Sequence, residues 1–524
     1  SLLESKEGQG MAMATVLSRA QRGMDAQQVR VEVDISNGLP AFAIVGLPEA
    51  VVKESKDRVR AAIANCNFEM PAGRITVNLS PADLPKEGGR FDLPIALGIL
   101  LASSQLPGAN LERCELYGEL SLSGELRPVK GVLLAALAAS REAHSLIVPA
   151  GNGDEARLVA QCPVATATHL LEVAAHVTQS KPLAFASGYE LPSTATHTLD
   201  LSEVHGQAQA RRALEIAAAG QHSLLFIGPP GTGKSMLAQR LPGLLPPMND
   251  DESLEVAAVR SISGRPLQLD QWRVRPFRSP HHTASAIALV GGGAFPRPGE
   301  ISLAHNGVLF LDELPEYDRK VLEVLREPLE NGTITVSRAA QQLEFPASFQ
   351  LIAAMNPCPC GYLGDAPGRC RCTQQKIERY RSRISGPLLD RLDMHVEVPR
   401  VPVSALHVPS TQNESTAVVA QRVRRARELQ LARQGMTNAK LGNRDIERYC
   451  RPIGAATAVL DRATTALGLS ARAHQRILRV ARTIADLADS ADIGAAQISE
   501  AIALRRFDRA RSNGAAVAPS AATV

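Results

Sequence analysis

The chain contains 524 residues, enough for two to four domains with well-buried cores. Its 57 lysines and arginines against 53 aspartates and glutamates give a net charge of +4, which indicates no particular class of partner. No apolar run reaches membrane-spanning length, and eight cysteines without a secretory leader favour a reducing compartment, the cytoplasm. We expect residues 1–13 to be an expression remnant and the native N-terminus, with the remnant at 1–10 and the native start at Met11 or Met13.

A first domain of strands and helices is predicted over residues 14–180. Apolar–polar alternation indicates half-buried strands, whereas apolar residues three and four apart indicate helices. The predicted strands are 29–35, 40–46, 74–79 and 145–148, and the predicted helices are 51–66 and 92–101. Residues 181–200 are rich in proline, serine, threonine and glycine and are expected to be a linker. A helix over 200–220 then leads into the next domain.

An apolar strand at 224–227 runs directly into a glycine-rich loop of the phosphate-binding pattern G-x-x-x-x-G-K-[ST]. Glycines let backbone N–H groups approach phosphate oxygens closely, and the following helix presents its positive end to the anion. Lys234 supplies a charge for the β- and γ-phosphates of ATP, and the Ser235 hydroxyl is a ligand for Mg²⁺. The predicted nucleotide-binding residues are Gly228, Pro229, Pro230, Gly231, Thr232, Gly233, Lys234 and Ser235.

Two further apolar strands end in polar side chains. The strand at 308–311 is followed by Asp312, placed to hold Mg²⁺, and by Glu313, placed to polarise the attacking water. The strand at 349–354 ends near Asn356, an amide suited to orient that water. Parallel strands that deliver polar groups from their carboxyl ends are typical of an open α/β sheet, and this set resembles the AAA+ ATPases.

Two insertions interrupt this predicted core. The first, 275–305, is rich in loop-forming residues and carries Arg275 and Arg278 near two adjacent histidines, which make a weak metal site because neighbouring side chains point apart. The second, 333–345, is predicted to be a hairpin with Arg338 at its turn, and it resembles the pre-sensor hairpin of helicase and chelatase AAA+ proteins. We expect these three arginines to contact DNA phosphates; the alternative is a packing role between subunits.

Four cysteines form two C-x-C pairs, Cys358 with Cys360 and Cys370 with Cys372, separated by nine residues. Four thiolates are a ligand set for structural Zn²⁺, with no open position for chemistry. The alternatives are four reduced thiols on a loop or a disulfide pair, and the uncommon spacing leaves all three open.

The region from residue 400 onward carries 19 lysines and arginines against 10 aspartates and glutamates. This balance favours nucleic acid as a partner, or reflects a solvated helical surface. A helical domain is predicted over 402–511 and a disordered tail over 512–524.

Three arginines are candidates for contacts with nucleotide. Arg391 lies between two aspartates, where it forms either a salt bridge to Asp393 or the arginine that reaches a neighbouring subunit's γ-phosphate, as the AAA+ resemblance implies. Arg383 is the second candidate for that role. Arg472 lies near the start of a predicted helix, from which it contacts nucleotide or simply faces solvent.

The stretch 122–140 resembles the proteolytic domain of Lon-type proteases, an α+β fold of the ribosomal protein S5 domain 2 type. Catalysis there needs a serine and a lysine within hydrogen-bond reach. On that pattern Arg90 stands at the position of the serine and Leu133 at that of the lysine, with Lys130 offset from it. The resemblance implies a Lon-like fold over 14–180 that is inactive as a protease.

Nearly the entire chain, 14–511, resembles the ComM/YifB family of magnesium-chelatase-like AAA+ ATPases. The stretches that carry the resemblance include GLPEAVVKESKDRVRAAI, RPFRSPHHTAS, NGVLFLDELPE and AAMNPCPCG. It implies an α/β protein with an AAA+ core at 201–401 and a helical lid at 402–511. It also implies a hexameric ring, stabilised by ATP or DNA, that uses ATP and Mg²⁺ and acts on single-stranded and branched DNA.

For function, the resemblance implies a helicase that promotes branch migration during integration of transforming DNA, with recombination proteins as further partners. The alternative is a chelatase-like motor that remodels a protein partner, such as a metal-insertion complex. ATP turnover that responds to DNA favours the first, and turnover indifferent to DNA favours the second.

Overall fold

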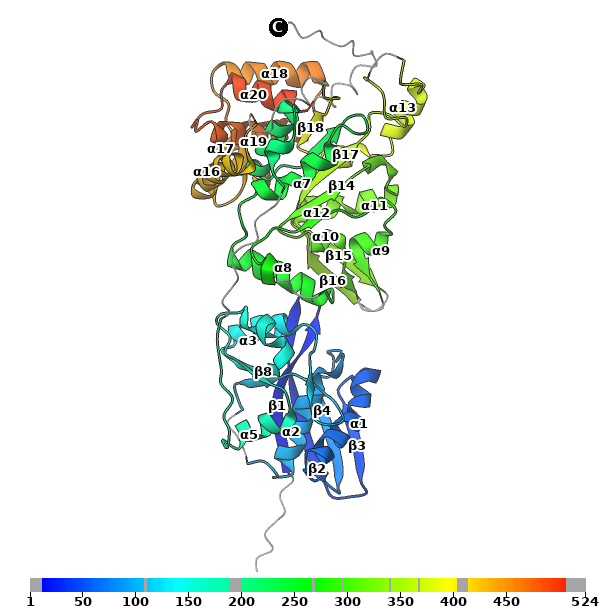
Figure 1. Ribbon diagram of the computed structural model, residues 1–524, viewed down its shortest axis with the longest axis vertical. Coiled ribbons are helices and arrows are strands. Elements are labelled where there is room, and N and C mark those ends of the chain that lie inside the picture. Colours follow the sequence, from blue (N-terminus) through cyan, green and yellow to red (C-terminus); the bar gives the residue numbers. More distant parts are fainter. Residues whose placement is uncertain are drawn as a thin grey trace, which may run out of the picture. The chain divides into compact units, whose positions relative to one another are not determined.

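The computed structural model describes residues 12–107, 111–188, 199–265, 269–293, 296–338, 341–365, 368–402 and 413–505. The chain divides into two compact units (Figure 1). The first comprises Ser1–Ser193 with Ser253–Trp272, and the second comprises Thr194–Glu252 with Arg273–Val524. The structure therefore differs from the expected AAA+ range at one point, because residues 253–272 group with the first unit.

A seven-stranded sheet in the order β3-β4-β2-β1-β5-β8-β9 forms the first unit. β1 and β2 make a long antiparallel ribbon, which β4 extends on the far side of β2. β5, β8 and β9 continue from β1 as parallel strands. The strands are β1 (Ala12–Arg22), β2 (Asp25–Ser36), β3 (Ala41–Val45), β4 (Arg74–Ser80), β5 (Cys114–Leu116), β8 (Ser145–Pro149) and β9 (Val164–Ala167), with a small ribbon of β6 (Glu119–Leu120) and β7 (Leu126–Arg127).

Apolar helices cover this sheet. Helix α2 is buried along nearly its whole length and packs on β1 and β2. Helix α3 contributes to a second apolar cluster, which also takes in Ala257, Ala258 and Trp272. Burial of these side chains is the physical reason why 253–272 belongs to the first unit. The helices are α1 (Ala50–Asn65), α2 (Asp92–Ala102), α3 (Val132–Arg141), α4 (Gly153–Arg157) and α5 (Leu170–Val177), and α8 (Asp250–Ile262) enters from the second unit.

Five parallel strands form the sheet of the second unit, in the order β11-β14-β17-β10-β18 (Figure 1). They are β10 (Leu224–Ile227), β11 (Phe277–Arg278), β14 (Val308–Leu311), β17 (Gln350–Met355) and β18 (Met394–Glu397). The three strands predicted to carry catalytic groups are neighbours, with β17 between β10 and β14. Because they are parallel, their carboxyl ends meet at one edge of the sheet. The predicted α/β class is confirmed.

Short helices and two ribbons complete this core. The helix predicted over 200–220 begins only at Ala208, because Gln207 has a left-handed φ of 52° and a 3-10 turn occupies Leu201–Glu203. The predicted hairpin is confirmed as β15 (Thr333–Arg338) and β16 (Gln341–Pro346). The remaining elements are α6 (Ala208–Gly220), α7 (Lys234–Leu244), α9 (Ala286–Val290), β12 (Gly291–Gly292), β13 (Arg297–Pro298), α10 (Glu300–Leu303), α11 (Arg319–Val324), α12 (Arg326–Asn331), α13 (Gln374–Arg381) and α14 (Gly386–Leu389).

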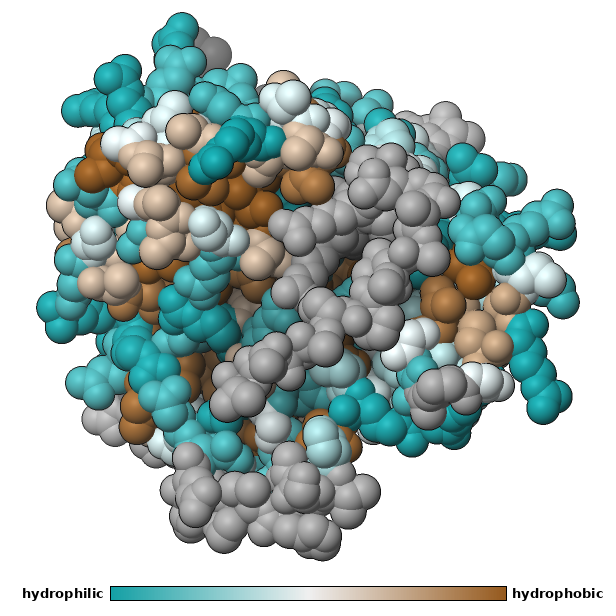
Figure 2. Space-filling view, turned by 90° about the horizontal axis from the view of Figure 1, so that it is seen from above, coloured by the Kyte–Doolittle hydropathy of each residue, from teal (hydrophilic) through white to brown (hydrophobic). Residues whose placement is uncertain are grey.

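The predicted C-terminal region is helical in its described part. Its helices are α16 (Thr416–Gln434), α17 (Asn443–Tyr449), α18 (Ala455–Leu467), α19 (Ala471–Leu487) and α20 (Ala495–Ala503). Their apolar faces share one cluster with the sheet of the second unit. Figure 2 shows hydrophilic side chains interspersed with apolar ones on the face that it views. The predicted tail at 512–524 and residues 189–198 of the predicted linker lie outside the described residues.

Candidate nucleotide-binding and catalytic site

The phosphate loop joins β10 to α7 and closes tightly on its own backbone. Gly231 and Gly233 have left-handed φ angles of 76° and 90°, which favour glycine. A side chain at Gly228 would meet the Val398 carbonyl oxygen at 2.1 Å, so glycine is required there as well. The turn leaves the first N–H groups of α7 without helical partners, as an anion-binding loop requires.

Lys234 is buried at the centre of the loop. Its Nζ donates to the carbonyl oxygens of Gly228 and Pro229, at 2.7 and 2.8 Å, and to Oδ1 of Asn356 at 3.2 Å. Burial lowers the pKa of Lys234, although nearby Asp312 and Glu313 oppose the shift. The structure thus brings the phosphate-loop lysine into direct contact with the polar group that follows β17.

Two oxygen ligands suited to Mg²⁺ lie side by side. The Ser235 hydroxyl donates to Oδ2 of Asp312 at 2.6 Å, and Oδ1 of Asp312 accepts from the backbone N–H of Glu313 at 2.9 Å. Hydroxyl and carboxylate oxygens are the donors that Mg²⁺ prefers, so this pair fits the ion. Ser235 and Asp312 would hold the ion there, and it would supply positive charge that offsets the negative charge of the phosphates.

Glu313 makes a contact that the sequence did not reveal. Its Oε2 lies 3.1 Å from Nδ1 of His282, one of the two adjacent histidines of the first insertion. Tyr317 stabilises this arrangement, because its hydroxyl donates to the Pro280 carbonyl oxygen at 2.6 Å. Only the general pattern of a histidine-bearing insertion before the second strand hinted at such a partner.

Arg391 and Arg383 differ in their exposure. Arg391 is buried, pairs with Glu330 and donates to the Pro387 carbonyl oxygen at 2.7 Å. The alternative salt bridge between Arg391 and Asp393 is therefore not formed. Arg383 is half exposed and donates to Oε2 of Glu316 at 2.8 Å.

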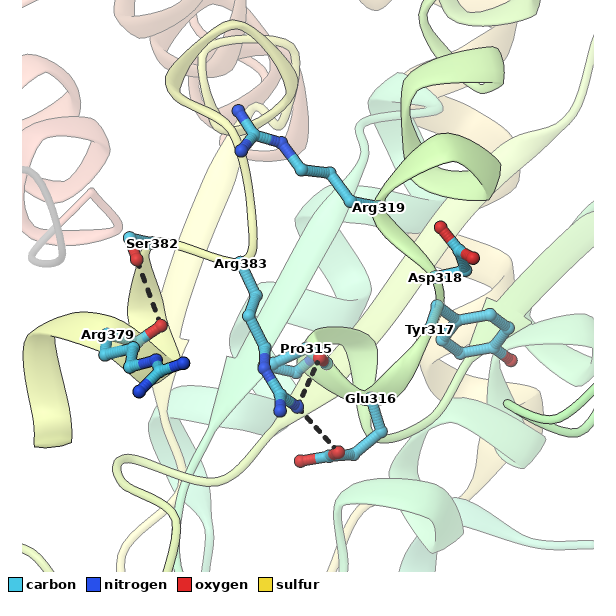
Figure 3. Close-up of a pocket in the computed structure, with 8 residues that line it drawn as sticks. All are labelled: Pro315, Glu316, Tyr317, Asp318, Arg319, Arg379, Ser382 and Arg383. Atoms are coloured by element: carbon cyan, nitrogen blue, oxygen red, sulfur yellow. Dashed lines mark hydrogen bonds and ion pairs between the residues drawn. The ribbon is translucent and has the colours of Figure 1, made fainter.

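Arg383 lines a groove of about 540 Å³ next to the strand end that bears Glu313. Figure 3 shows its guanidinium reaching Glu316 and the Pro315 carbonyl, while Arg319 extends from the opposite wall. The lining residues are Pro315, Glu316, Tyr317, Asp318, Arg319, Arg379, Ser382 and Arg383. Three arginines around one open groove make a surface suited to an anionic group.

A buried ion-pair network joins the helical domain to the sheet. Asp393, at the start of β18, pairs with Arg476 of α19 and accepts from the backbone N–H of Ser223 at 3.0 Å. Burial alone would raise the pKa of Asp393, but Arg476 and His222 hold it far below its usual range. Arg472 lies one turn before Arg476 on α19 and is exposed, so its nucleotide contact stays a prediction.

The arginines of the first insertion are not at loop tips, which corrects the sequence-based placement. Arg275 is partly buried and donates to the carbonyl oxygens of Pro246 and Asn306 at 2.7 Å, besides pairing with Glu252. Arg278 lies in β11 and forms a two-pronged pair with Glu300, at 2.6 and 2.8 Å. Nearby carboxylates, which the sequence pattern did not associate with them, satisfy both side chains.

The second insertion keeps its predicted geometry. Arg338 is the last residue of β15, beside the turn of the hairpin, and its side chain lies outside the described part of the chain. Its contact with DNA therefore stays a prediction.

The four clustered cysteines fit a tetrahedral metal. The Sγ atoms of Cys358, Cys360 and Cys370 lie 3.4–3.8 Å apart, and those of all four, including Cys372, lie within 4.8 Å of one another. A zinc ion with Zn–S bonds of about 2.3 Å would separate its ligands by about 3.8 Å. All four cysteines are free thiols in the structure. Hydrogen bonds from the Tyr362 backbone and neighbouring thiols lower the pKa of Cys360 to about 6, whereas the contacts with Cys358 and Cys360 raise the pKa values of Cys370 and Cys372.

The first unit has no Ser–Lys pair at the positions that the Lon resemblance identified. Arg90 is buried there, and burial lowers the pKa of its guanidinium. Leu133 lies in the apolar core, and Lys130 is exposed. The Lon-like fold and its inactivity as a protease stay predictions.

Comparison with known proteins matches three family models to the chain. The model "Magnesium chelatase, subunit ChlI" covers residues 200–406, and the model of its C-terminal part covers 413–505. A third, "Subunit ChlI of Mg-chelatase", covers 31–152 in the first unit.

Curated relatives match over nearly the full length. Competence protein ComM of Haemophilus influenzae is 50% identical over 503 residues, which are 95% of this chain and 98% of that protein. The chain belongs to the ComM/YifB family. YifB of Salmonella typhimurium is 49% identical over 95% of the chain and 98% of its own length. The magnesium-chelatase subunit ChlI of Nicotiana tabacum is 27% identical over 35% of the chain and 43% of its own length.

Membership of the ComM/YifB family confirms the predicted resemblance and the magnesium-chelatase-like AAA+ core with its helical C-terminal region. Across the described ranges, no helix is both long and apolar enough to cross a membrane.

Proposed function

We propose that this chain is an ATP-hydrolysing ring motor that acts on DNA and promotes branch migration while transforming DNA is integrated. The observation that carries the proposal is the convergence of Lys234, Asp312 and Asn356 around the phosphate loop, in a chain half identical to a competence protein over nearly its whole length. Glu313 polarises the attacking water, and Asn356 orients it.

The proposed assembly is a homohexamer, stabilised by ATP or DNA. In this assembly an arginine supplied by a neighbouring subunit completes each site. The same head-to-tail contact then recurs between all neighbours, and contacts of this kind close into rings. Exposed apolar residues of the helical domain, such as Leu431, Met436 and Ile453, suit a surface that is covered in the ring.

Subunit mixing distinguishes the two candidate arginines. Arg391→Ala or Arg383→Ala subunits are combined with Lys234→Ala subunits, and ATP turnover is measured over a range of ratios. Recovery identifies the arginine that acts in trans. The half-exposed position of Arg383 favours it on accessibility, whereas Arg391 must first leave Glu330. No recovery with either variant, in rings of normal size, contradicts a trans-acting arginine at these positions.

The DNA step is tested by ATP turnover with and without single-stranded and branched DNA in a salt series. Phosphate contacts predict stimulation that falls steeply with salt and depends little on sequence. A branched substrate labelled on one arm reports branch migration directly. Turnover that ignores DNA at every salt concentration contradicts the proposal.

A second candidate function is ATP-driven remodelling of a protein partner. It is favoured by the match of all three parts of the chain to magnesium-chelatase subunit models. A purified client that stimulates turnover where DNA does not would support it.

We also propose one structural Zn²⁺ held by Cys358, Cys360, Cys370 and Cys372. The ion would tie the segment after Asn356 to the start of α13 and would take no part in hydrolysis. Metal analysis of protein purified without chelator is expected to give one zinc per chain. Cys358→Ser loses the zinc, whereas Cys66→Ala, which also removes one thiol, retains it.

The first unit is proposed to be proteolytically inactive, because Arg90 and Leu133 occupy the positions at which a serine and a lysine would be needed. Cleavage of unfolded protein substrates that is seen with the wild type and lost in the Lys130→Ala variant would contradict this assignment.

A further inference from the structure

Arg90 brings a positive charge into the interior of the first unit. It lies in a 3-10 turn, Gly89–Phe91, and only 9% of the residue is accessible. In the part of the chain that the structure describes, its guanidinium forms no hydrogen bond and no ion pair. Burial lowers the pKa of Arg90, and Tyr117 and Glu87 oppose this shift electrostatically, not through hydrogen bonds. A buried guanidinium loses its hydration, so one without a partner in the protein indicates a binding function.

Tyr117 supplies a second polar group near Arg90. The residue is fully buried, and its hydroxyl has no hydrogen-bond partner among the described residues. The backbone ties the two positions together, because the N–H of Gly118 donates to the Arg90 carbonyl oxygen at 3.2 Å. Burial raises the pKa of Tyr117, so its hydroxyl keeps its proton at neutral pH and can donate it to a ligand.

The third group is the N-terminal end of α3, for which the described residues provide no side-chain cap. Gly131 precedes the helix with a left-handed φ of 77°, and the first helical bond runs from the Ala135 N–H to the Gly131 carbonyl oxygen. The N–H groups of residues 132–134 therefore have no helical partner and carry the positive end of the helix dipole. A Cβ at Gly131 would lie 3.8 Å from Nη1 of Arg90 and 2.3 Å from Oε1 of Gln21. The Arg90 guanidinium thus reaches this helix end, where a side chain at residue 131 would collide with Gln21.

We propose that Arg90, Tyr117 and the N-terminal end of α3 bind a small oxyanion of the phosphate class. The donors are a two-pronged guanidinium, a hydroxyl and a row of backbone N–H groups, and they come from three different elements. A carboxylate offers two oxygens, whereas a tetrahedral phosphate or sulfate offers oxygens in several directions and so matches donors from three sides.

The burial of these groups limits the size of the ligand. Both side chains are at least nine-tenths buried, which suits a free anion or a terminal phosphate. It does not suit an internal phosphate of a DNA strand, because that phosphate carries a nucleoside on either side. The inference does not rest on the proposed function, since all of these residues belong to the first unit.

Equilibrium dialysis with radiolabelled inorganic phosphate tests the site in the full-length Lys234→Ala protein, in which the phosphate loop lacks its lysine. We expect one bound phosphate per chain. Arg90→Met, made in this parent, removes the charge at similar volume and should weaken binding about ten- to hundredfold, and Tyr117→Phe should weaken it about three- to tenfold. Arg141→Met is the matched control and should bind as the parent does, because Arg141 is exposed in the last turn of α3, at its other end.

Thermal unfolding separates binding from a structural role of Arg90. Because a ligand stabilises only a protein that binds it, phosphate at constant ionic strength should raise the unfolding temperature of the parent but not that of Arg90→Met. In phosphate-free buffer Arg90→Met should be at least as stable as the parent, since an apolar group replaces a buried charge. Trp272, the single tryptophan, lies in the same apolar cluster as Tyr117, so its fluorescence follows unfolding of this unit.

Competition identifies the source of the anion. Sulfate should displace the phosphate, because it has the same shape. Displacement by AMP as well assigns the site to terminal phosphate groups, whereas displacement by sulfate without AMP assigns it to free oxyanions. The proposal is overturned if the parent binds no phosphate, or if Arg90→Met binds it as the parent does. It is also overturned if Arg90→Met is destabilised and phosphate stabilises parent and variant alike, because Arg90 would then have a structural role alone.

Discussion

The two units both bury charged side chains, but they do so in opposite ways. In the first, Arg19 forms a closed network with Glu115 and Glu142, at 2.6 and 2.9 Å, and His144 completes it. In the second, the buried Lys234 donates to Asn356, and Asp312 accepts from Ser235, at the carboxyl edge of the sheet beside the phosphate loop. Charged groups that are paired with one another stabilise a fold. Charged groups that lie beside a phosphate loop are placed to act on a bound nucleotide.

Glu313→Gln should separate these two roles most clearly. We expect ATP turnover to fall about 10²–10⁴-fold, because the amide no longer polarises water, while nucleotide affinity and the free energy of unfolding stay unchanged. Single-turnover hydrolysis and binding of a fluorescent ATP analogue measure the two effects. Full turnover in this variant would mean that another group polarises the water.

Arg19→Met should give the opposite result. Removing one partner of a buried pair leaves Glu115 uncompensated and typically costs about 3–5 kcal/mol of stability. Arg19 also lowers the pKa of Glu142, because its side-chain hydrogen bond favours the ionised carboxylate. Urea unfolding should report the loss, and ATP affinity below the transition should match that of the wild type. A variant as stable as the wild type would contradict the structural role of the network.

Asp393→Asn tests a case between these two, since Asp393 is buried in an ion pair yet joins the helical domain to the nucleotide-binding sheet. Loss of the pair with Arg476 should cost about 3 kcal/mol at neutral pH. Because Arg476 and His222 lower the pKa of Asp393, its contribution is present above the ordinary aspartate pKa of 3.8 and is lost as the pH falls below that value.

The difference in unfolding free energy between wild type and Asp393→Asn should therefore shrink from pH 7 towards pH 3. A difference that stays constant over this range would show that the ion pair does not provide the stability. Arg425→Ala, which breaks the exposed pair with Asp489, serves as the control and should change stability by less than about 1 kcal/mol.

The sequence predicted the parts of the site that lie on consecutive elements. Asp312 and Asn356 each follow an apolar strand directly, and Lys234 ends the loop that follows a third. Parallel strands bring such positions to one edge without further information. The contact between His282 and Glu313 was not predictable in this way, because it depends on how an irregular insertion folds back onto the sheet. A histidine pair by itself predicts neither a metal nor a partner.

Arg275 is a second residue whose contacts could not be predicted from the sequence pattern. A basic insertion between catalytic strands suggested a free loop tip, but the Glu252 carboxylate and two backbone carbonyls that bind it come from segments distant in sequence. The grouping of residues 253–272 with the first unit was not predictable for a similar reason. The segment contains apolar residues, but the sequence does not indicate which surface covers them.

Arg338→Ala has the smallest expected effect and bears on the DNA path. The hairpin formed by β15 and β16 keeps its predicted form, whereas Arg275 and Arg278 are satisfied within the protein, so Arg338 is the remaining candidate of the three for phosphate contact. A lost phosphate contact should weaken single-stranded DNA binding a few-fold per subunit. It should also reduce the slope of log affinity against log salt by about 0.7 for each contact removed.

Basal hydrolysis should not change, because Arg338 lies away from the phosphate loop in sequence and ends a strand outside the catalytic sheet. Arg425→Ala removes the same charge from the helical domain and should leave the slope unaltered. If Arg338→Ala matches the wild type in affinity and slope while Arg425→Ala does not, the DNA path runs along the basic helical domain rather than past the hairpin.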